Sequence, residues 1–266
     1  MSDQPAAAPK WADLRQRVLS AFAMLVIGVL AVWAGGIWFH LAISLICGLM
    51  VWELARMVDS TSGAKASWIG MASGIGLFIA SYSPAPGFVL PLLFAPGFVG
   101  VGQLTQNRTT FMLYATAILI AGFGFMALRD EFGTLWMCWL LIVVVVVDVA
   151  GYFAGRMIGG PKFWPRVSPK KTWSGTIAGW VGAAIVGLVF MAVTGGGTNI
   201  IGVSVSCAMA AQMGDIAESA IKRRVGVKDS SNLIPGHGGV LDRFDGMLGA
   251  SLLLLLTQQF TAFPPS

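Results

Sequence analysis

The sequence predicts an all-α, polytopic integral membrane protein with about nine transmembrane helices and a cytoplasmic N-terminus. Its composition, its apolar runs and its one-sided basic residues support this fold class. Of 266 residues, 56% are hydrophobic and 11% are charged, and the mean hydropathy is +0.77. A soluble domain carries about a quarter charged residues. Most of the surface of this protein must therefore face lipid.

The apolar runs set the number of predicted spans. A helix that crosses the hydrocarbon core needs about 20 mostly apolar residues, and the third and fourth runs are the weakest because they are short and rich in Gly and Pro. The predicted spans are Val18–Trp38, Leu41–Met57, Ser67–Tyr82, Gly87–Gly102, Thr110–Leu128, Thr134–Gly155, Thr172–Thr194, Asn199–Ile221 and Phe244–Phe263. We expect a cytoplasmic segment over 1–17, N-terminal transmembrane helices over 18–133 and a transmembrane region that carries the chemistry over 134–266.

The basic residues provide an independent test of this topology, because cytoplasmic loops collect Lys and Arg. With the N-terminus inside, Arg129 is the only one of the 17 basic residues that falls outside. Most of the others lie in two loops, 156–171 and 222–243. We therefore expect a multi-pass protein of the inner (cytoplasmic) membrane whose site faces the cytoplasm. The basic residues are confined to short connections, which favours anionic headgroups and phosphates as partners and predicts no nucleic acid.

A carboxylate ends the sixth predicted span. On a helix, Asp148, Tyr152 and Arg156 share one face, and Gly151 and Gly155 form a neighbouring stripe that lets another helix approach. Close helix packing is sufficient to explain the glycines, without a functional role. A carboxylate at the cytoplasmic end of an apolar span is a functional candidate, with Arg156 as a potential partner.

A basic segment precedes the seventh predicted span. Pro169 favours an extended conformation, and Lys170 and Lys171 are two adjacent point charges suited to phosphate oxygens. Thr172 can cap the following helix, whose free N–H groups attract anions. Ser168 completes this motif. A positive-inside anchor at a span boundary explains the lysines equally well.

The eighth predicted span ends in a helical face that carries two carboxylates, a hydroxyl and an ammonium group. Asp215, Glu218, Ser219 and Lys222 lie at steps of zero, three, four and seven residues, so they share one side of the helix. This arrangement suits a divalent cation on Asp215, with phosphate held by the basic turn that follows. For Glu218 and Lys222 a purely structural salt bridge is the alternative.

The loop before the last span carries the fourth motif. Residues 235–239 place glycines around His237, and glycine lets a backbone approach a ligand closely. Asp242 and Asp245 follow one helical turn apart, and Mg²⁺ takes one or two protein carboxylates together with water and substrate phosphates. His237 has either a loop or a substrate role. A Walker-type phosphate loop is absent, so a nucleotide site must use another device.

These motifs together resemble the signature of the phosphatidate cytidylyltransferase (CDP-diglyceride synthase) family. The resemblance is specific over about residues 148–245, and the first five spans are similar only in hydropathy. Two positions depart from the family pattern: Ser174 stands where an acid is usual, and Gly151 where alanine is usual. The residues that carry the signature are Ser219, Lys222, Arg223, Lys228, Asp229, Pro235, His237, Gly238, Gly239, Asp242, Arg243, Phe244 and Asp245.

The resemblance implies an enzyme that converts CTP and phosphatidate to CDP-diacylglycerol and pyrophosphate in phospholipid biosynthesis. It implies catalytic roles for Asp215, Asp242, Asp245, Lys222 and Arg223. It implies Mg²⁺ on Asp215 and Asp242, with Asp245 and Asp148 in support, a second, monovalent cation and a homodimer. The implied substrate-binding residues are Ser168, Lys170, Lys171, Thr172, Ser219, Lys228, Asp229, His237, Gly238, Gly239 and Arg243.

Two alternatives remain open at this point. A transporter or channel would use Asp148, Asp215 and Glu218 as an ion path, but it leaves the basic loops and the glycine-rich segment unexplained. Another CTP-dependent lipid enzyme, such as a polyprenol kinase, would share the substrate and differ in product. A CDP-alcohol phosphotransferase usually has an Asp-Gly-x-x-Ala-Arg run, which this sequence lacks.

Overall fold

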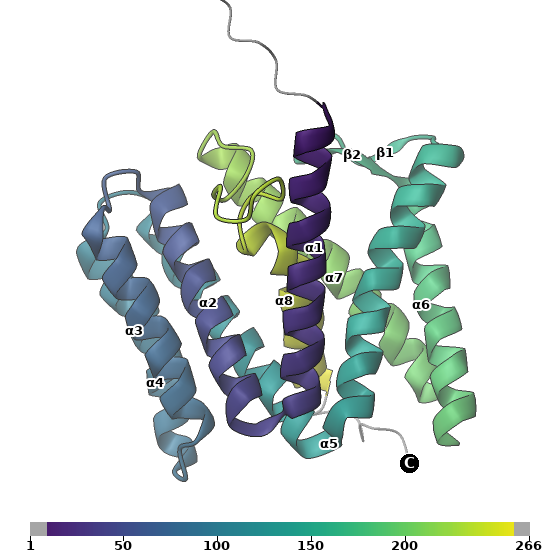
Figure 1. Ribbon diagram of the computed structural model, residues 1–266, viewed down its shortest axis with the longest axis horizontal. Helices are drawn as coiled ribbons and strands as arrows, with labels where there is room; N and C mark the ends of the chain where they lie inside the picture. Colours follow the sequence, from purple (N-terminus) through teal and green to yellow (C-terminus); the bar gives the residue numbers. More distant parts are fainter. Residues whose placement is uncertain (1–9, 258–266) are drawn as a thin grey trace, which may run out of the picture.

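The computed structural model describes residues 10–257, which form a bundle of eight α-helices and one short β-ribbon (Figure 1). The all-helical membrane class predicted from the sequence is confirmed, and the ribbon is the only part of the described chain with strands. The elements are α1 (Lys10–Ala34), α2 (Gly36–Val58), α3 (Ala64–Ser81), α4 (Pro86–Gln103), α5 (Arg108–Met157), β1 (Lys162–Trp164), β2 (Ser168–Thr172), α6 (Trp173–Thr194), α7 (Asn199–Arg224) and α8 (Leu241–Thr257).

The helices follow the predicted spans with two differences in their division. The fifth and sixth predicted spans are the two arms of α5, which bends at Gly133, where φ is 82° and ψ is −174°. Six of the described helices are long and apolar enough to cross a membrane. Part of the predicted segment 1–17 and the end of the predicted span Phe244–Phe263 lie outside the described residues.

The first two helices divide earlier than the hydropathy predicts. The break falls at Gly35 and not between Trp38 and Leu41, because Gly35 adopts φ 61° and Gly36 φ 46°, which favour glycine. A Cβ on Gly35 would lie 2.7 Å from the guanidinium of Arg129. That guanidinium donates a hydrogen bond from Nε to a carbonyl at the end of α1.

The predicted loop 156–171 is more ordered than expected, since β1 and β2 pair within it as an antiparallel ribbon with Lys162 opposite Thr172. The extended start predicted from Pro169 is therefore strand β2. The predicted helix cap is confirmed, because Thr172 Oγ1 accepts a hydrogen bond from the backbone N–H of Gly175 at 3.2 Å. The ribbon and the cap together fix Lys171 at the start of α6.

Two hydrophobic clusters form the core, and α8 contributes to both. The first joins α2, α3, α4 and the first arm of α5, and includes Leu241 and Leu248 of α8. The second joins the other arm of α5 with α6 and α7, and includes Ala250 and Leu254. Helix α8 is therefore held between the two halves of the bundle.

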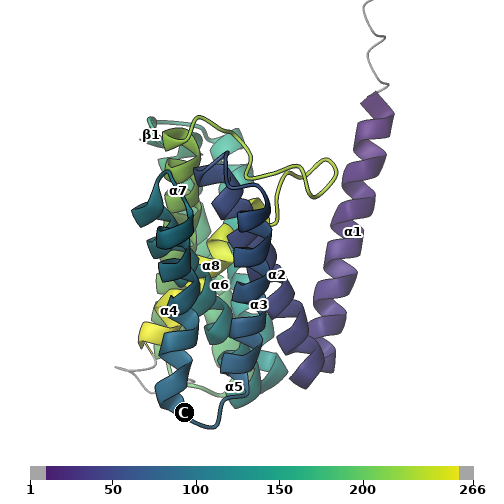
Figure 2. The same ribbon diagram turned by 90° about the vertical axis from the view of Figure 1, so that its left-hand side faces the viewer.

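Helix α1 stands apart from the rest of the bundle (Figure 2). Its apolar side chains are largely exposed, as at Phe22 and Trp33, which is expected for a helix surrounded by lipid. Near its start, the loop before α8 reaches across to it: Ser20 Oγ lies 2.8 Å from Nδ1 of His237. This loop and the β-ribbon lie at the same end of the bundle (Figure 1), whereas the end of α1, to which Arg129 donates, lies at the other.

Candidate active site

Helices α7 and α8 pack backbone against backbone. A Cβ on Gly214 would collide with the carbonyl oxygen of Asp245, and one on Gly249 would collide with that of Ala210. Glycine at these two positions therefore permits the close approach. As a result, Asp215, which follows Gly214, lies within electrostatic range of Asp245.

Two lysines pair with the acids of α7 and α8. Lys222 Nζ lies 2.6 Å from Oε2 of Glu218 and 2.6 Å from Oδ1 of Asp242. From the ribbon, Lys171 Nζ lies 2.5 Å from Oδ2 of Asp215. The predicted Glu218–Lys222 salt bridge is confirmed, and Lys222 also joins α7 to α8. We call Lys171, Asp215, Glu218, Lys222, Asp242 and Asp245 the acid–base cluster.

Asp242 is surrounded by hydrogen-bond donors. Its Oδ2 accepts from the backbone N–H of Gly239 at 2.8 Å and of Ser230 at 2.9 Å, and from the Ser230 hydroxyl at 2.9 Å. A Cβ on Gly239 would collide with Ser230 Oγ, which explains the glycine. Since both carboxylate oxygens only accept, this shell stabilises the ionised form of Asp242 in a fixed position.

A second group of predicted residues forms a pocket of about 370 Å³ beside Asp215. Asp148 lies here, in electrostatic range of Asp215 and Lys171. The predicted pairing of Arg156 with Asp148 does not form among the described residues, because Arg156 donates instead to the Tyr152 hydroxyl at 2.8 Å. The residues that line this lysine pocket are Val147, Asp148, Gly151, Tyr152, Gly155, Arg156, Lys170, Lys171, Thr172, Gly175, Thr176 and Gln212.

The predicted glycine stripe, Gly151 and Gly155, lines the same pocket. A Cβ on Gly151 would meet the carbonyl oxygen of Gly175 at 3.3 Å, and one on Gly155 would meet Thr172 Oγ1 at 2.9 Å. Helix α6 therefore approaches α5 along this stripe, as predicted. This contact brings Lys171 next to Asp148.

Other predicted site residues lie away from the acid–base cluster. Arg223 and Lys228 are exposed, and Asp229 lies near the backbone of Gly238. His237 contacts α1 through Ser20. Ser168 pairs with Trp164 in the ribbon, whereas Ser219 Oγ donates to Oδ1 of Asp215 at 3.2 Å and Arg243 lies within electrostatic range of Asp148.

Glu53 of α2 is part of this site and was not predicted. Its side chain is fully buried, and its carboxylate accepts from the backbone N–H groups of Val240 at 2.9 Å and Leu241 at 2.7 Å. The hydroxyls of Ser231, at 2.6 Å, and Ser230, at 3.3 Å, also donate to it. Glu53 therefore anchors the start of α8 from the other half of the bundle. The sequence feature that could have identified Glu53 is that it is a single acid within an apolar predicted span.

Replacing Glu53 by glutamine should destabilise this anchor. One acceptor oxygen becomes an NH₂ group that faces donors, so at least one buried donor loses its partner, at a cost of about 1–3 kcal/mol. We expect a lower thermal unfolding midpoint and faster hydrogen exchange at the Val240 and Leu241 amides. Glu131→Gln, at an exposed acid on α5, is the matched control, and equal stability of the two variants would contradict the anchoring role.

The site fits a cation that shares its coordination with a ligand. Within residues 10–257, no three His, Cys, Asp or Glu side chains form a metal group by themselves, but Mg²⁺ needs only one or two carboxylates when phosphates complete its shell. Asp215 offers such a carboxylate, whereas both oxygens of Asp242 already accept hydrogen bonds, so Asp242 would hold a cation in exchange for Lys222 at Oδ1. In addition, Glu218 Oε1 is buried and faces the carboxyl group of Asp245. Two buried carboxyl groups this close require either a shared proton or a nearby cation.

Comparisons with known proteins agree with this arrangement. Residues 15–260 match the sequence model of the cytidylyltransferase family. A protein of Brucella suis named phosphatidate cytidylyltransferase is 34% identical over 264 residues, which cover 95% of this chain and 96% of the relative. A protein of Staphylococcus aureus with the same name is 31% identical over 251 residues, which cover 88% of this chain and 95% of the relative.

Proposed function

This chain belongs to the cytidylyltransferase family, and we propose that it is an enzyme that transfers a cytidylyl group from CTP to phosphatidate, as the names of its relatives indicate. The products are CDP-diacylglycerol and pyrophosphate. The observation that carries this assignment within the structure is the acid–base cluster, in which two lysines and the acids of α7 and α8 meet at the basic end of the bundle.

The reaction needs positioning and charge neutralisation more than a strong protein base. A phosphate oxygen of phosphatidate is already anionic, and it forms a bond to the α-phosphorus of CTP while the bond to pyrophosphate breaks. Lys171 and Lys222 supply fixed positive charge where negative charge gathers. Their side chains are held by the ion pairs with Asp215 and Asp242, which keeps the cost of reorganisation low.

Mg²⁺ is part of the proposal, with Asp215 and Asp242 as the residues that would hold it and Asp245 and Asp148 in support. When bound, Mg²⁺ neutralises phosphate charge and orients the triphosphate. The buried Oε1 of Glu218, which faces the carboxyl group of Asp245, supports the second, monovalent cation. Lys170 lines the lysine pocket, where it would contact a phosphate.

The proposed topology places the N-terminus and the acid–base cluster on the cytoplasmic side of the inner membrane. The positive-inside rule and the common location of the ribbon and the loop before α8 at one end of the bundle support it (Figure 1). A water-soluble nucleotide and a membrane lipid can meet only at such an interface. We also propose the homodimer that the sequence resemblance implies, which chemical cross-linking in native membranes would test.

The reaction itself is tested by product analysis. Purified protein supplied with CTP and phosphatidate should release pyrophosphate and form CDP-diacylglycerol, and removal of Mg²⁺ by a chelator should abolish both because the triphosphate charge is then uncompensated. Phosphorylated lipid with CDP as the second product would identify a CTP-dependent kinase and refute the proposal. Ion flux in liposomes without CTP turnover would indicate a transporter.

A further inference from the structure

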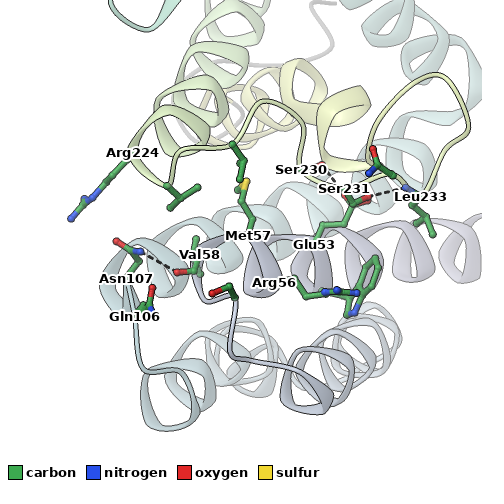
Figure 3. Close-up of a pocket in the computed structure, with 15 residues that line it drawn as sticks. Glu53, Arg56, Met57, Val58, Gln106, Asn107, Arg224, Ser230, Ser231 and Leu233 are labelled. Carbon is green, nitrogen blue, oxygen red and sulfur yellow. Dashed lines mark hydrogen bonds between the residues drawn. The ribbon is translucent and has the colours of Figure 1, made fainter. Parts of the chain in front are cut away.

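A second pocket lies between the end of α2, for which the sequence indicated no role, and the predicted loop 222–243. It has a volume of about 790 Å³, which is in the range of small-molecule sites. Its walls come from the end of α2, the turn between α4 and α5, and the loop after α7 (Figure 3). Because Arg56 and Arg224 both line it, we call it the arginine pocket.

Hydrogen bonds preform the walls of the arginine pocket. Asp59, directly after α2, accepts from the backbone N–H of Thr105 at 2.6 Å and of Gln106 at 3.3 Å, which joins the turn after α2 to the turn before α5. Burial raises the pKa of Asp59, but the hydrogen bonds from Thr61 and Thr105 outweigh burial and lower it overall. The Arg56 guanidinium is held over the Trp52 ring, 5.3 Å from its centroid.

The arginine pocket is separated from Asp242 of the acid–base cluster by a single residue, Ser230. Ser230 lines the pocket, and its hydroxyl lies 2.9 Å from Oδ2 of Asp242 and 3.3 Å from Oε2 of Glu53. On the other side of the cluster, Lys171 lines the lysine pocket and pairs with Asp215. The cluster therefore has one pocket on each side.

The two pockets differ in their surroundings. The arginine pocket is lined by helix ends and loops and carries two arginines. The lysine pocket is lined by the ribbon and by side chains inside α5, α6 and α7, such as Val147, Thr176 and Gln212, and these three helices are long and apolar enough to cross a membrane. A soluble nucleotide suits the arginine pocket, and a lipid phosphate suits the lysine pocket.

Asn107 gives the arginine pocket a means to identify a base. Its Nδ2 donates to the carbonyl oxygen of Val58 at 3.0 Å. Because that carbonyl can only accept, the amide orientation is fixed, and Oδ1 is left as an acceptor in the pocket (Figure 3). Cytosine presents an amino group at the position where uracil presents a carbonyl oxygen. A fixed acceptor therefore binds cytosine and repels uracil.

We propose that the arginine pocket holds the cytosine ring of CTP, and that Oδ1 of Asn107 accepts a hydrogen bond from its amino group. Arg56 and Arg224 then lie beside the ribose and the phosphates that lead to the cluster. This inference rests on the proposed function and adds the location of the base and the residue that selects it.

The decisive variant is Asn107→Gly. Asn107 has φ 45°, a conformation that glycine adopts without strain, so the amide is removed and the turn is kept. We expect the ratio of kcat/KM for CTP to that for UTP to fall by about tenfold or more, the value of one hydrogen bond to a preorganised site. The ratio is independent of the fraction of folded enzyme.

The matched control is Asn199→Gly, at an exposed asparagine at the start of α7 and the far end of the bundle, and it should leave the ratio unchanged. A wild-type enzyme that uses CTP and UTP equally, or an unchanged ratio in Asn107→Gly, would overturn the inference while the proposed function stands. A wild-type enzyme that forms no CDP-lipid would refute the proposed function itself.

A second measurement separates nucleotide from lipid headgroup as the occupant. In Arg56→Ala we expect the KM for CTP to rise about tenfold and the KM for phosphatidate to stay within about twofold. Lys65→Ala is the control, because Lys65 is exposed at the same end and its Nζ donates to the carbonyl oxygen of Gln103. A rise in the KM for phosphatidate alone would place the headgroup in this pocket and overturn the inference.

Discussion

Asp242→Asn is expected to lower the rate of CDP-diacylglycerol formation by about 10²–10³-fold or more, the cost of losing a preorganised charge in an active site. Asp242 receives donors on both oxygens, from Lys222, Ser230 and Gly239. Asparagine places an NH₂ group against one of these donors and removes the negative charge that would hold Mg²⁺. Both effects displace Lys222 from the reacting phosphates.

The measurement is steady-state turnover of purified protein with CTP, phosphatidate and Mg²⁺. Insertion into the membrane should be unchanged, because α8 keeps its apolar contacts with both core clusters. Turnover close to that of the wild type would remove Asp242 from the metal site. Loss of the protein from the membrane would instead show that the hydrogen-bond shell is needed for folding.

Asp215→Asn should lower the rate of CDP-diacylglycerol formation by a similar factor and should also change its dependence on Mg²⁺. The asparagine Oδ1 can still accept from Ser219 or Lys171, so the local structure should be retained and the change is mainly one of charge. Without the carboxylate, Lys171 lacks a negatively charged partner and the site has one ligand fewer for Mg²⁺. We expect the Mg²⁺ concentration for half-maximal turnover to rise in addition to the fall in kcat.

Titration of turnover with Mg²⁺ tests this prediction, with Ser206→Ala on the same helix as a control, because Ser206 is outside the site and bonds only to the Gly202 carbonyl oxygen. An unchanged Mg²⁺ dependence in Asp215→Asn would mean that Asp215 positions Lys171 and does not bind metal. The thermal unfolding midpoint should change little, because Asp215 is partly exposed.

The amino-acid sequence was sufficient for the membrane class and the approximate position of each helix, whereas the chemical role of loops 156–171 and 222–243 stays a prediction. Apolar length determines whether a segment can cross a bilayer, and this property is local. Helical periodicity likewise predicted the Glu218–Lys222 pair and the approach of another helix along Gly151 and Gly155, because each depends on one helix face. The cap at Thr172 was predictable for the same reason.

Only the tertiary structure decided which helices supply the partners of these residues. Lys171 pairs with Asp215, Lys222 bridges to Asp242, and Glu53 anchors α8 from α2. Each of these contacts depends on how far one helix is rotated and how closely it approaches the next. Glycines and side-chain volumes at distant positions set that geometry. The spacing of residues along a single helix therefore carries no information about it.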